Sequence, residues 1–215
     1  DGYIAVLPPN NFISIAINLC TAPLIMGNAV ICKPAPETIY SFHFMLNILH
    51  EAGLPKSALS VLHGDEEMIG SVLLTHRDLA HVHFTGSMHT MHKLVRIVGE
   101  NIEKYRGFPR VIGETGGKNF IMVYDDADPR EVASAIIRSG FGYQGRKCSA
   151  ASRVYMTDEM WKKVKPVLEQ YMQEITIGDD MVNFTCYIGA IISKQEYEKI
   201  VGYIERARLA TGTKE

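Results

Sequence analysis

The 215-residue sequence has no uninterrupted apolar run long enough to cross a bilayer, so it predicts no transmembrane helix. It also has no excess of charge of one sign, because 22 lysines and arginines stand against 24 acidic residues and the formal net charge is -2. The basic residues are dispersed, which argues against a nucleic acid or an anionic membrane as the main partner. We therefore expect a small-molecule ligand.

Cysteine is scarce, and its spacing excludes two kinds of site. The four cysteines, at positions 20, 32, 148 and 186, form no C-x-x-C pair and no short disulfide framework. We expect reduced thiols in a reducing compartment, either the cytoplasm or the mitochondrial matrix. The eight histidines complete no set with cysteines or carboxylates, so no metal site is predicted.

The first half of the chain alternates short β-type runs with helical patterns. Strands are predicted over residues 3–7, 29–32, 59–62 and 80–84. Helices are predicted over 13–26 and about 37–52, after the segment 63–70 as far as about 74, and after the opening segment 85–87. Four such βα steps predict an α/β fold with a mostly parallel, helix-covered sheet. The G-x-G-x-x-G phosphate loop of many dinucleotide-binding folds is missing.

The second half of the chain continues with a strand, a helix and a polar loop. Residues 120–123 predict a strand, and Asp128-Pro129 predicts a helix start, with Asp128 as the N-cap. After a strand near 154–156, helices are expected near 158–175 and 194–207, and we expect their apolar faces to be ordinary core.

One cysteine lies in a loop that is rich in glycine. Cys148 falls within residues 140–153, on the connection that leaves the helix begun at Asp128. Arg146 and Lys147 add positive charge, which favours the thiolate and so a nucleophile. The alternative is a packing cysteine in an ordinary loop, and the local sequence leaves both open.

A carboxylate stands between small residues upstream of this loop. Glu114, within residues 112–119, has the chemistry of a base that activates water. A solvated turn carboxylate is the alternative for a glutamate beside glycines.

Five segments taken together resemble the aldehyde dehydrogenase superfamily in order and spacing. They are residues 8–12, 33–35, 84–87, 112–119 and 140–153. Within that superfamily, Phe108-Pro109-Arg110 and the run Gly-Arg-Lys-Cys-Ser-Ala-Ala-Ser-Arg at 145–153 are most similar to the 1-pyrroline-5-carboxylate dehydrogenases. The resemblance implies NAD(P)-dependent oxidation of glutamate γ-semialdehyde to glutamate in proline catabolism.

The resemblance assigns a catalytic trio. Cys148 would attack the aldehyde, and the amide of Asn11, with the Cys148 backbone N–H, would stabilise the oxyanion. Glu114 would activate the water that hydrolyses the thioester. Asn11 follows two prolines, so a turn-forming asparagine is the alternative.

The resemblance also implies a Rossmann-type cofactor domain that binds NAD, with NADP left open. The residues it aligns with the cofactor are Pro9, Lys33, Gly86, Ser87, Thr115 and Gly116. Lys33 would bind the adenosine ribose, and the helix start at Ser87 would bind the pyrophosphate. Many relatives place an acid three positions after this lysine, but Pro36 stands there and the acid is Glu37. This departure leaves the choice between NAD and NADP open.

For the substrate, the resemblance suggests that Phe12 packs on the aliphatic stem of the semialdehyde. Ser149 and Lys147 would meet its distal carboxylate, since a hydroxyl and a cation suit that group. Phe12 as plain core and Ser149 as a loop hydroxyl are the alternatives.

Two incomplete domains are expected, a dinucleotide-binding domain at 1–113 and part of an α/β catalytic domain at 114–215. Measured against the family, both ends are missing, so we expect a fragment of a protein that is a homo-oligomer at full length. Two other functions stay open: a dehydrogenase of another semialdehyde, and a catalytically silent nucleotide-binding or interaction fragment.

Overall fold

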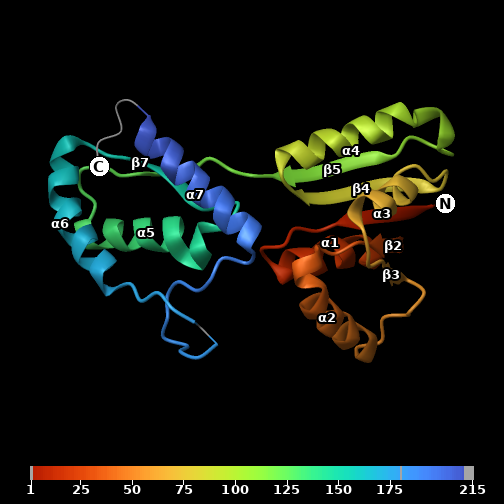
Figure 1. Cartoon of the computed structure of the whole chain (residues 1–215), viewed down its shortest axis with the longest axis horizontal. Helices are drawn as coiled ribbons and strands as arrows, with labels where there is room; N and C mark the ends of the chain where they lie inside the picture. The colour runs from red at the N-terminus through yellow and green to blue at the C-terminus, as the bar shows by residue number, and fades with distance from the viewer. Residues whose placement is uncertain (1, 180, 211–215) are drawn as a thin grey trace. The chain divides into compact units, whose positions relative to one another are not determined.

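The computed structural model describes residues 2–179 and 181–210, and the chain divides into two compact units, Asp1–Gly116 and Gly117–Glu215 (Figure 1). The boundary between the units follows Gly116, and the division into a dinucleotide-binding and a catalytic domain between residues 113 and 114 stays a prediction. Each unit has its own hydrophobic core.

The first unit is built on a five-stranded sheet with strand order β3-β2-β1-β4-β5. Its strands are β1 (Tyr3–Leu7), β2 (Ala29–Cys32), β3 (Leu59–Val61), β4 (Leu79–Gly86) and β5 (Arg110–Thr115). Every neighbouring pair is parallel. The predicted α/β class with a parallel sheet is therefore confirmed, and the predicted bounds of the first two strands match those observed.

Helices cover both faces of this sheet (Figure 1). They are α1 (Ile13–Ile25), α2 (Ile39–Glu51), α3 (Glu66–Leu73) and α4 (Met88–Glu100), with short 3-10 turns at Pro36–Thr38 and Ile102–Lys104. Side chains of α1 and α2 pack with Ile4 and Val6, and side chains of α3 and α4 pack with Ala5. The alternation along β1 follows from the two-residue period of a strand, which sends successive side chains to opposite faces.

The strand order places a reversal beside β1. The chain moves from β1 outward to β2 and β3, and then crosses over to β4 and β5 on the other side of β1. In parallel α/β sheets, ligands bind at the carboxyl ends of the strands where the order reverses in this way. The carboxyl edge of this sheet is therefore the place to look for a site.

The second unit has a two-stranded parallel sheet of β6 (Asn119–Met122) and β7 (Ala151–Tyr155). It also has the helices α5 (Pro129–Phe141), α6 (Asp158–Glu174) and α7 (Lys194–Leu209). Its core is formed by α5 and α6, for example Ala133 and Val164, both fully buried, together with side chains of the small sheet and Val123 beside it. Asp128 is confirmed as the N-cap of α5, because its side chain accepts a hydrogen bond from the Arg130 N–H at 2.7 Å.

The expectation that α7 presents a core face is wrong. This helix contributes no buried residue, and Tyr197, Tyr203 and Ile204 are exposed. Its polar side chains instead include a partly buried one, Glu196, which is held by an ion pair. No helix among the described residues is long and apolar enough to cross a membrane.

We expect Phe42→Ala to lower the free energy of unfolding of the first unit by about 3–5 kcal/mol, because Phe42 is fully buried and its removal leaves a cavity. Tyr40 lies on the same helix but is 87% exposed, so Tyr40→Ala should change stability by no more than about 0.5 kcal/mol. Urea denaturation followed by circular dichroism measures both variants. Equal losses in the two variants would contradict the assignment of Phe42 to the core.

Candidate active site

The residues aligned with the cofactor and with part of the catalytic trio gather at the carboxyl edge of the first sheet. Each follows or ends a strand: Pro9, Asn11 and Phe12 after β1, Lys33 after β2, Gly86 and Ser87 at the end of β4, and Glu114, Thr115 and Gly116 at the end of β5. Because the strands are parallel, their carboxyl ends share one edge. Asn11 and Glu114 belong to this unit and Cys148 to the other, so the convergence of the trio stays a prediction.

The ends of β4 and β5 are locked in register, with Thr85 opposite Glu114 and Gly86 opposite Thr115. Thr85 is buried and Glu114 is exposed, so the carboxylate is open to solvent at this edge. A Cβ on Gly86 would lie 2.5 Å from the ring of Phe84, so packing inside the strand itself favours glycine here.

The helix α4 begins directly after this point. Ser87 is its N-cap, and its hydroxyl accepts a hydrogen bond from the Thr90 N–H at 3.1 Å. The first N–H groups of a helix have no partner within the helix and attract anions. This geometry fits a pyrophosphate. The space beside Gly116 is also open, since a Cβ there would meet nothing within 4 Å.

Lys33 is the buried cation of this edge. Its side chain is 7% exposed, and its Nζ donates to Glu66 Oε1 at 2.6 Å, from the first turn of α3. Its backbone N–H donates to the Val6 carbonyl at 3.0 Å, which fixes the lysine at the end of β2. Lys33 therefore lies at the carboxyl edge of the sheet, and its charge is partly compensated by a carboxylate.

In the second unit, the loop that carries Cys148 leaves α5 through an unusual backbone. The 3-10 segment Gly142–Gly145 includes three consecutive residues with positive φ: Tyr143 at 58°, Gln144 at 55° and Gly145 at 65°. A side chain larger than hydrogen is disfavoured in this region, so the two non-glycine residues store strain. Strain of this kind is concentrated at functional sites, and here it ends three residues before the cysteine.

Asn119 and Gly117 hold the backbone of Cys148. The Asn119 amide donates to the Cys148 carbonyl at 2.7 Å. A Cβ on Gly117 would lie 2.3 Å from the same carbonyl oxygen, so only glycine allows this close approach. At the other end of the loop, the Ala151 N–H donates to Ser139 Oγ at 3.2 Å.

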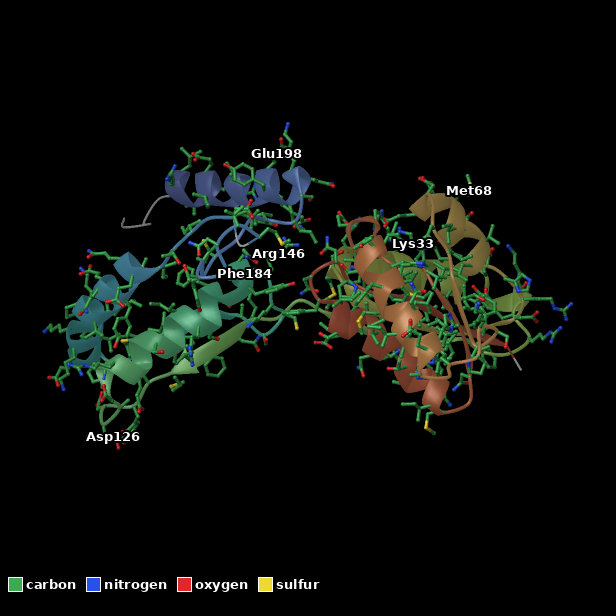
Figure 2. The ribbon with its side chains drawn as sticks, turned by 90° about the horizontal axis from the view of Figure 1, so that it is seen from below. Lys33, Met68, Asp126, Arg146, Phe184 and Glu198 are labelled. Atoms are coloured by element: carbon green, nitrogen blue, oxygen red, sulfur yellow. The ribbon has the colours of Figure 1, made fainter. Side chains whose placement is uncertain are left out.

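The charge of Arg146, which was expected to favour the Cys148 thiolate, is shared with an ion-pair partner. Its Nη1 donates to Glu196 Oε2 on α7, and both side chains are mostly buried. In Figure 2 Arg146 lies on the side of α7 opposite to Glu198. The hydrogen bond from Arg146 and the charges of Arg146 and Lys199 lower the pKa of Glu196, against a smaller opposing effect of burial. The positive charge expected beside Cys148 is therefore partly neutralised.

The four cysteines differ in access. Cys20 and Cys32 are fully buried in the first core, and hydrogen bonding with Cys20 together with burial raises the pKa of Cys32 well above its usual range. Such thiols are poor nucleophiles. Cys148 and Cys186 are half-buried, and of these only Cys148 lies in the strained loop.

The three predicted substrate residues lie in both units. Phe12 is half-buried as the N-cap residue of α1, Lys147 is half-buried and Ser149 is exposed. A hollow of about 490 Å³ in the second unit is lined partly by Arg138, Tyr171 and Glu174 and contains none of the predicted site residues. We assign it no role in the chemistry.

Three residues that support the site were not assigned a role from the sequence: Glu66, Asn119 and Glu196. Each binds a residue 29 to 50 positions away. Asn119 lies in a segment used for the family resemblance, which was a usable signal, whereas Glu66 and Glu196 lie outside all five segments.

We expect Asn119→Ala to loosen the Cys148 loop, because the lost hydrogen bond contributes about 1 kcal/mol. Amide hydrogens at residues 147–151 should exchange about fivefold faster in hydrogen-exchange mass spectrometry. Asn183→Ala removes an asparagine cap in another loop and should leave these amides unchanged. Unaltered exchange at 147–151 in Asn119→Ala would show that this contact does not hold the loop.

The Arg146–Glu196 pair predicts acid-sensitive stability. Since the folded-state pKa of Glu196 is lowered, its contribution is present above the unfolded pKa and is lost as pH falls through the folded pKa. Glu196→Gln should cost on the order of 1 kcal/mol at pH 7, and the difference from the unmodified protein should shrink below about pH 4. Urea denaturation between pH 7 and pH 3 measures this, with Glu198→Gln on the same helix as the control. A difference that does not change with pH would rule out this linkage.

Comparison with known proteins gives a consistent result. The model of the aldehyde dehydrogenase family matches residues 2–214. The mitochondrial delta-1-pyrroline-5-carboxylate dehydrogenase of Danio rerio is 37% identical over 208 residues, which are 97% of this chain and 37% of that protein. The human protein of the same name is 36% identical over 97% of this chain and 37% of its own length.

The chain is also similar to solved structures of pyrroline-5-carboxylate dehydrogenases. A Delta-pyrroline-5-carboxylate dehydrogenase from Mycobacterium tuberculosis bound with NAD is 39% identical, with a TM-score of 0.93, over 98% of this chain and 39% of that chain. A 1-pyrroline-5-carboxylate dehydrogenase from Thermus with bound NAD is 31% identical, with a TM-score of 0.87, over 96% and 40%. The chain thus spans about two fifths of the length of these relatives. With its parallel sheet, its strained cysteine loop and a family match over residues 2–214, this chain belongs to the aldehyde dehydrogenase family.

Proposed function

We propose that the protein to which this chain belongs oxidises L-glutamate γ-semialdehyde to glutamate, with NAD as the electron acceptor. The observation that carries the proposal is the position of Cys148, a half-buried thiol on a loop of strained backbone, in a chain of this family. The names of the relatives support the substrate, and the NAD-bound relatives support the cofactor.

The chemistry begins at the thiol. Cys148 Sγ attacks the carbonyl carbon of the aldehyde, and the oxyanion that forms is stabilised by the Asn11 amide and the Cys148 backbone N–H. Asn119, through the Cys148 carbonyl, holds the backbone from which the thiol and this N–H project. A loop fixed in this way keeps the nucleophile in one orientation, which lowers the entropic cost of attack.

NAD, when bound, supplies the acceptor for the hydride that leaves the carbon attached to sulfur. The carboxyl edge of the first sheet has groups that suit NAD. Ser87 begins a helix whose N–H groups attract the pyrophosphate, and Lys33 is a buried cation at the end of β2. Pro9, Gly86, Thr115 and Gly116 lie at the same edge and would line this site.

Hydrolysis of the thioester on Cys148 completes the cycle. Glu114 is exposed at the end of β5 and is the base that we assign to the attacking water. The acid is released, and the sulfur recovers its proton. Phe12, Lys147 and Ser149 are proposed to hold the stem and the distal carboxylate of the substrate.

We further propose that the full-length protein is a homo-oligomer of the mitochondrial matrix or the cytoplasm. The relatives of Danio rerio and human are named mitochondrial, which supports the first compartment.

Cys148→Ala in the full-length protein should abolish aldehyde oxidation, lowering kcat at least about 10³-fold, because no other group supplies the covalent step. Cys186→Ala removes the other half-buried thiol and should leave kcat within about twofold. The NADH absorbance assay measures both. Substantial turnover by Cys148→Ala would remove the basis of the proposal and favour a silent or differently acting protein.

Glu114→Gln should mainly slow hydrolysis of the thioester. Steady-state kcat should fall by about 10²-fold or more, while a pre-steady-state burst of NADH close to one per active site is retained. Rapid-mixing absorbance separates the two phases. A lost burst would instead place Glu114 in the step before hydrolysis.

The substrate is tested by comparing kcat/KM of the full-length protein for glutamate semialdehyde, succinic semialdehyde and aliphatic aldehydes. The proposal expects the highest value for glutamate semialdehyde. A clearly higher kcat/KM for another aldehyde would contradict the proposed substrate and leave the proposed dehydrogenase chemistry intact.

A further inference from the structure

An acidic side chain from a distant part of the sequence reaches the lysine at the end of β2. Lys33 and Glu66 are 33 residues apart, and Nζ lies 2.6 Å from Oε1. Figure 2 shows Lys33 lying near α3, the helix that carries Met68. The lysine is 7% exposed and the glutamate 70%, so the pair has a buried cation and an accessible anion.

The path of the chain explains why Glu66 reaches this position. β3 lies beside β2, and the Leu62 N–H, just after β3, donates to the Cys32 carbonyl at 2.8 Å. The connection from β3 to α3 therefore runs past the end of β2. Asp65 caps α3 by accepting from the Met68 N–H at 2.8 Å, which sets the helix start at Glu66.

The pair retains capacity for a ligand. A carboxylate has about four acceptor positions, and the lysine occupies one of them. The ammonium group has three donors, of which Glu66 takes one. An accessible carboxylate at the carboxyl edge of a parallel sheet is the group that receives the ribose hydroxyls of NAD in nucleotide-binding α/β folds, where a cation instead accommodates the 2′-phosphate of NADP.

We propose that Glu66 is the residue that selects NAD over NADP. Its carboxylate accepts from the vicinal hydroxyls of the adenosine ribose while Lys33 holds it in place, and it repels a 2′-phosphate. Because Glu66 compensates the charge of Lys33, the lysine does not act as an attractive site for that phosphate. The assignment rests on the proposed binding of NAD at this edge.

Neighbouring side chains do not offer the same arrangement. Pro36 has no acceptor in its side chain, and Glu37, which is exposed like Glu66, lies in the 3-10 turn Pro36–Thr38. The carboxylate bound to the lysine comes from α3 instead. Glu37 is the acid nearest to Lys33 in the sequence, which makes it the matched control.

The test compares Glu66→Gln with Glu37→Gln in the full-length protein, measuring the dissociation constants of NAD and NADP by isothermal titration calorimetry. Glu66→Gln should raise the dissociation constant of NAD about tenfold, because a charge-assisted hydrogen bond to the ribose is lost. The dissociation constant of NADP should stay unchanged or fall. Glu37→Gln should leave both constants within about twofold. Melting temperatures check folding, and Glu66 is exposed enough that little change is expected.

The outcomes separate this assignment from the proposed function. If the unmodified protein binds NAD but Glu66→Gln alters neither constant, or weakens both equally, the role of Glu66 is overturned and the proposed function stands. If Glu37→Gln produces the shift instead, specificity belongs to the 3-10 turn. If the unmodified protein binds neither dinucleotide, the proposed function fails together with this inference.

Discussion

The parallel pairing of β1 with β2 on one side and β4 on the other is the constraint on which the first unit depends. Parallel strands need crossover connections, and the helices in those connections bury both faces of the sheet. Ala5 and Val6, on opposite faces of β1, are both fully buried as a result. The same geometry brings every loop that leaves a strand to one edge, where residues from positions 9 to 116 come together.

In each unit, a basic side chain at a candidate site residue or beside one pairs with an acidic residue far away in the sequence. Lys33 pairs with Glu66 in the first unit, and Arg146 pairs with Glu196 in the second. A cation removed from water loses hydration energy, so it needs a counter-charge and hydrogen-bond partners close by. These pairs therefore do more than hold chain segments together. The first pair lowers the net charge at the end of β2, and the second moderates the positive charge near the cysteine.

Close packing explains why glycine stands at positions 86 and 117. Gly117 lets the Cys148 carbonyl come near the Asn119 amide, and Gly86 makes room for the ring of Phe84. At Gly117 the space is occupied by the Cys148 carbonyl, and at Gly86 by the ring of Phe84 in the same strand, so a side chain would have to displace these groups. The strained residues Tyr143 and Gln144 add a conformation that the surroundings must maintain.

The sequence by itself determined the α/β class, the bounds of β1 and β2, the cap of α5 at Asp128 and the family, because each depends on local patterns of side chains or on motifs read in order. Candidate residues at the strand ends followed from the same patterns.

Only the tertiary structure decided which acid meets Lys33, what holds the Cys148 carbonyl, and that α7 contributes no buried side chain. These features depend on contacts between residues tens of positions apart. Such contacts are set by how strands and helices pack in space, and the local periodicity of the sequence does not encode them.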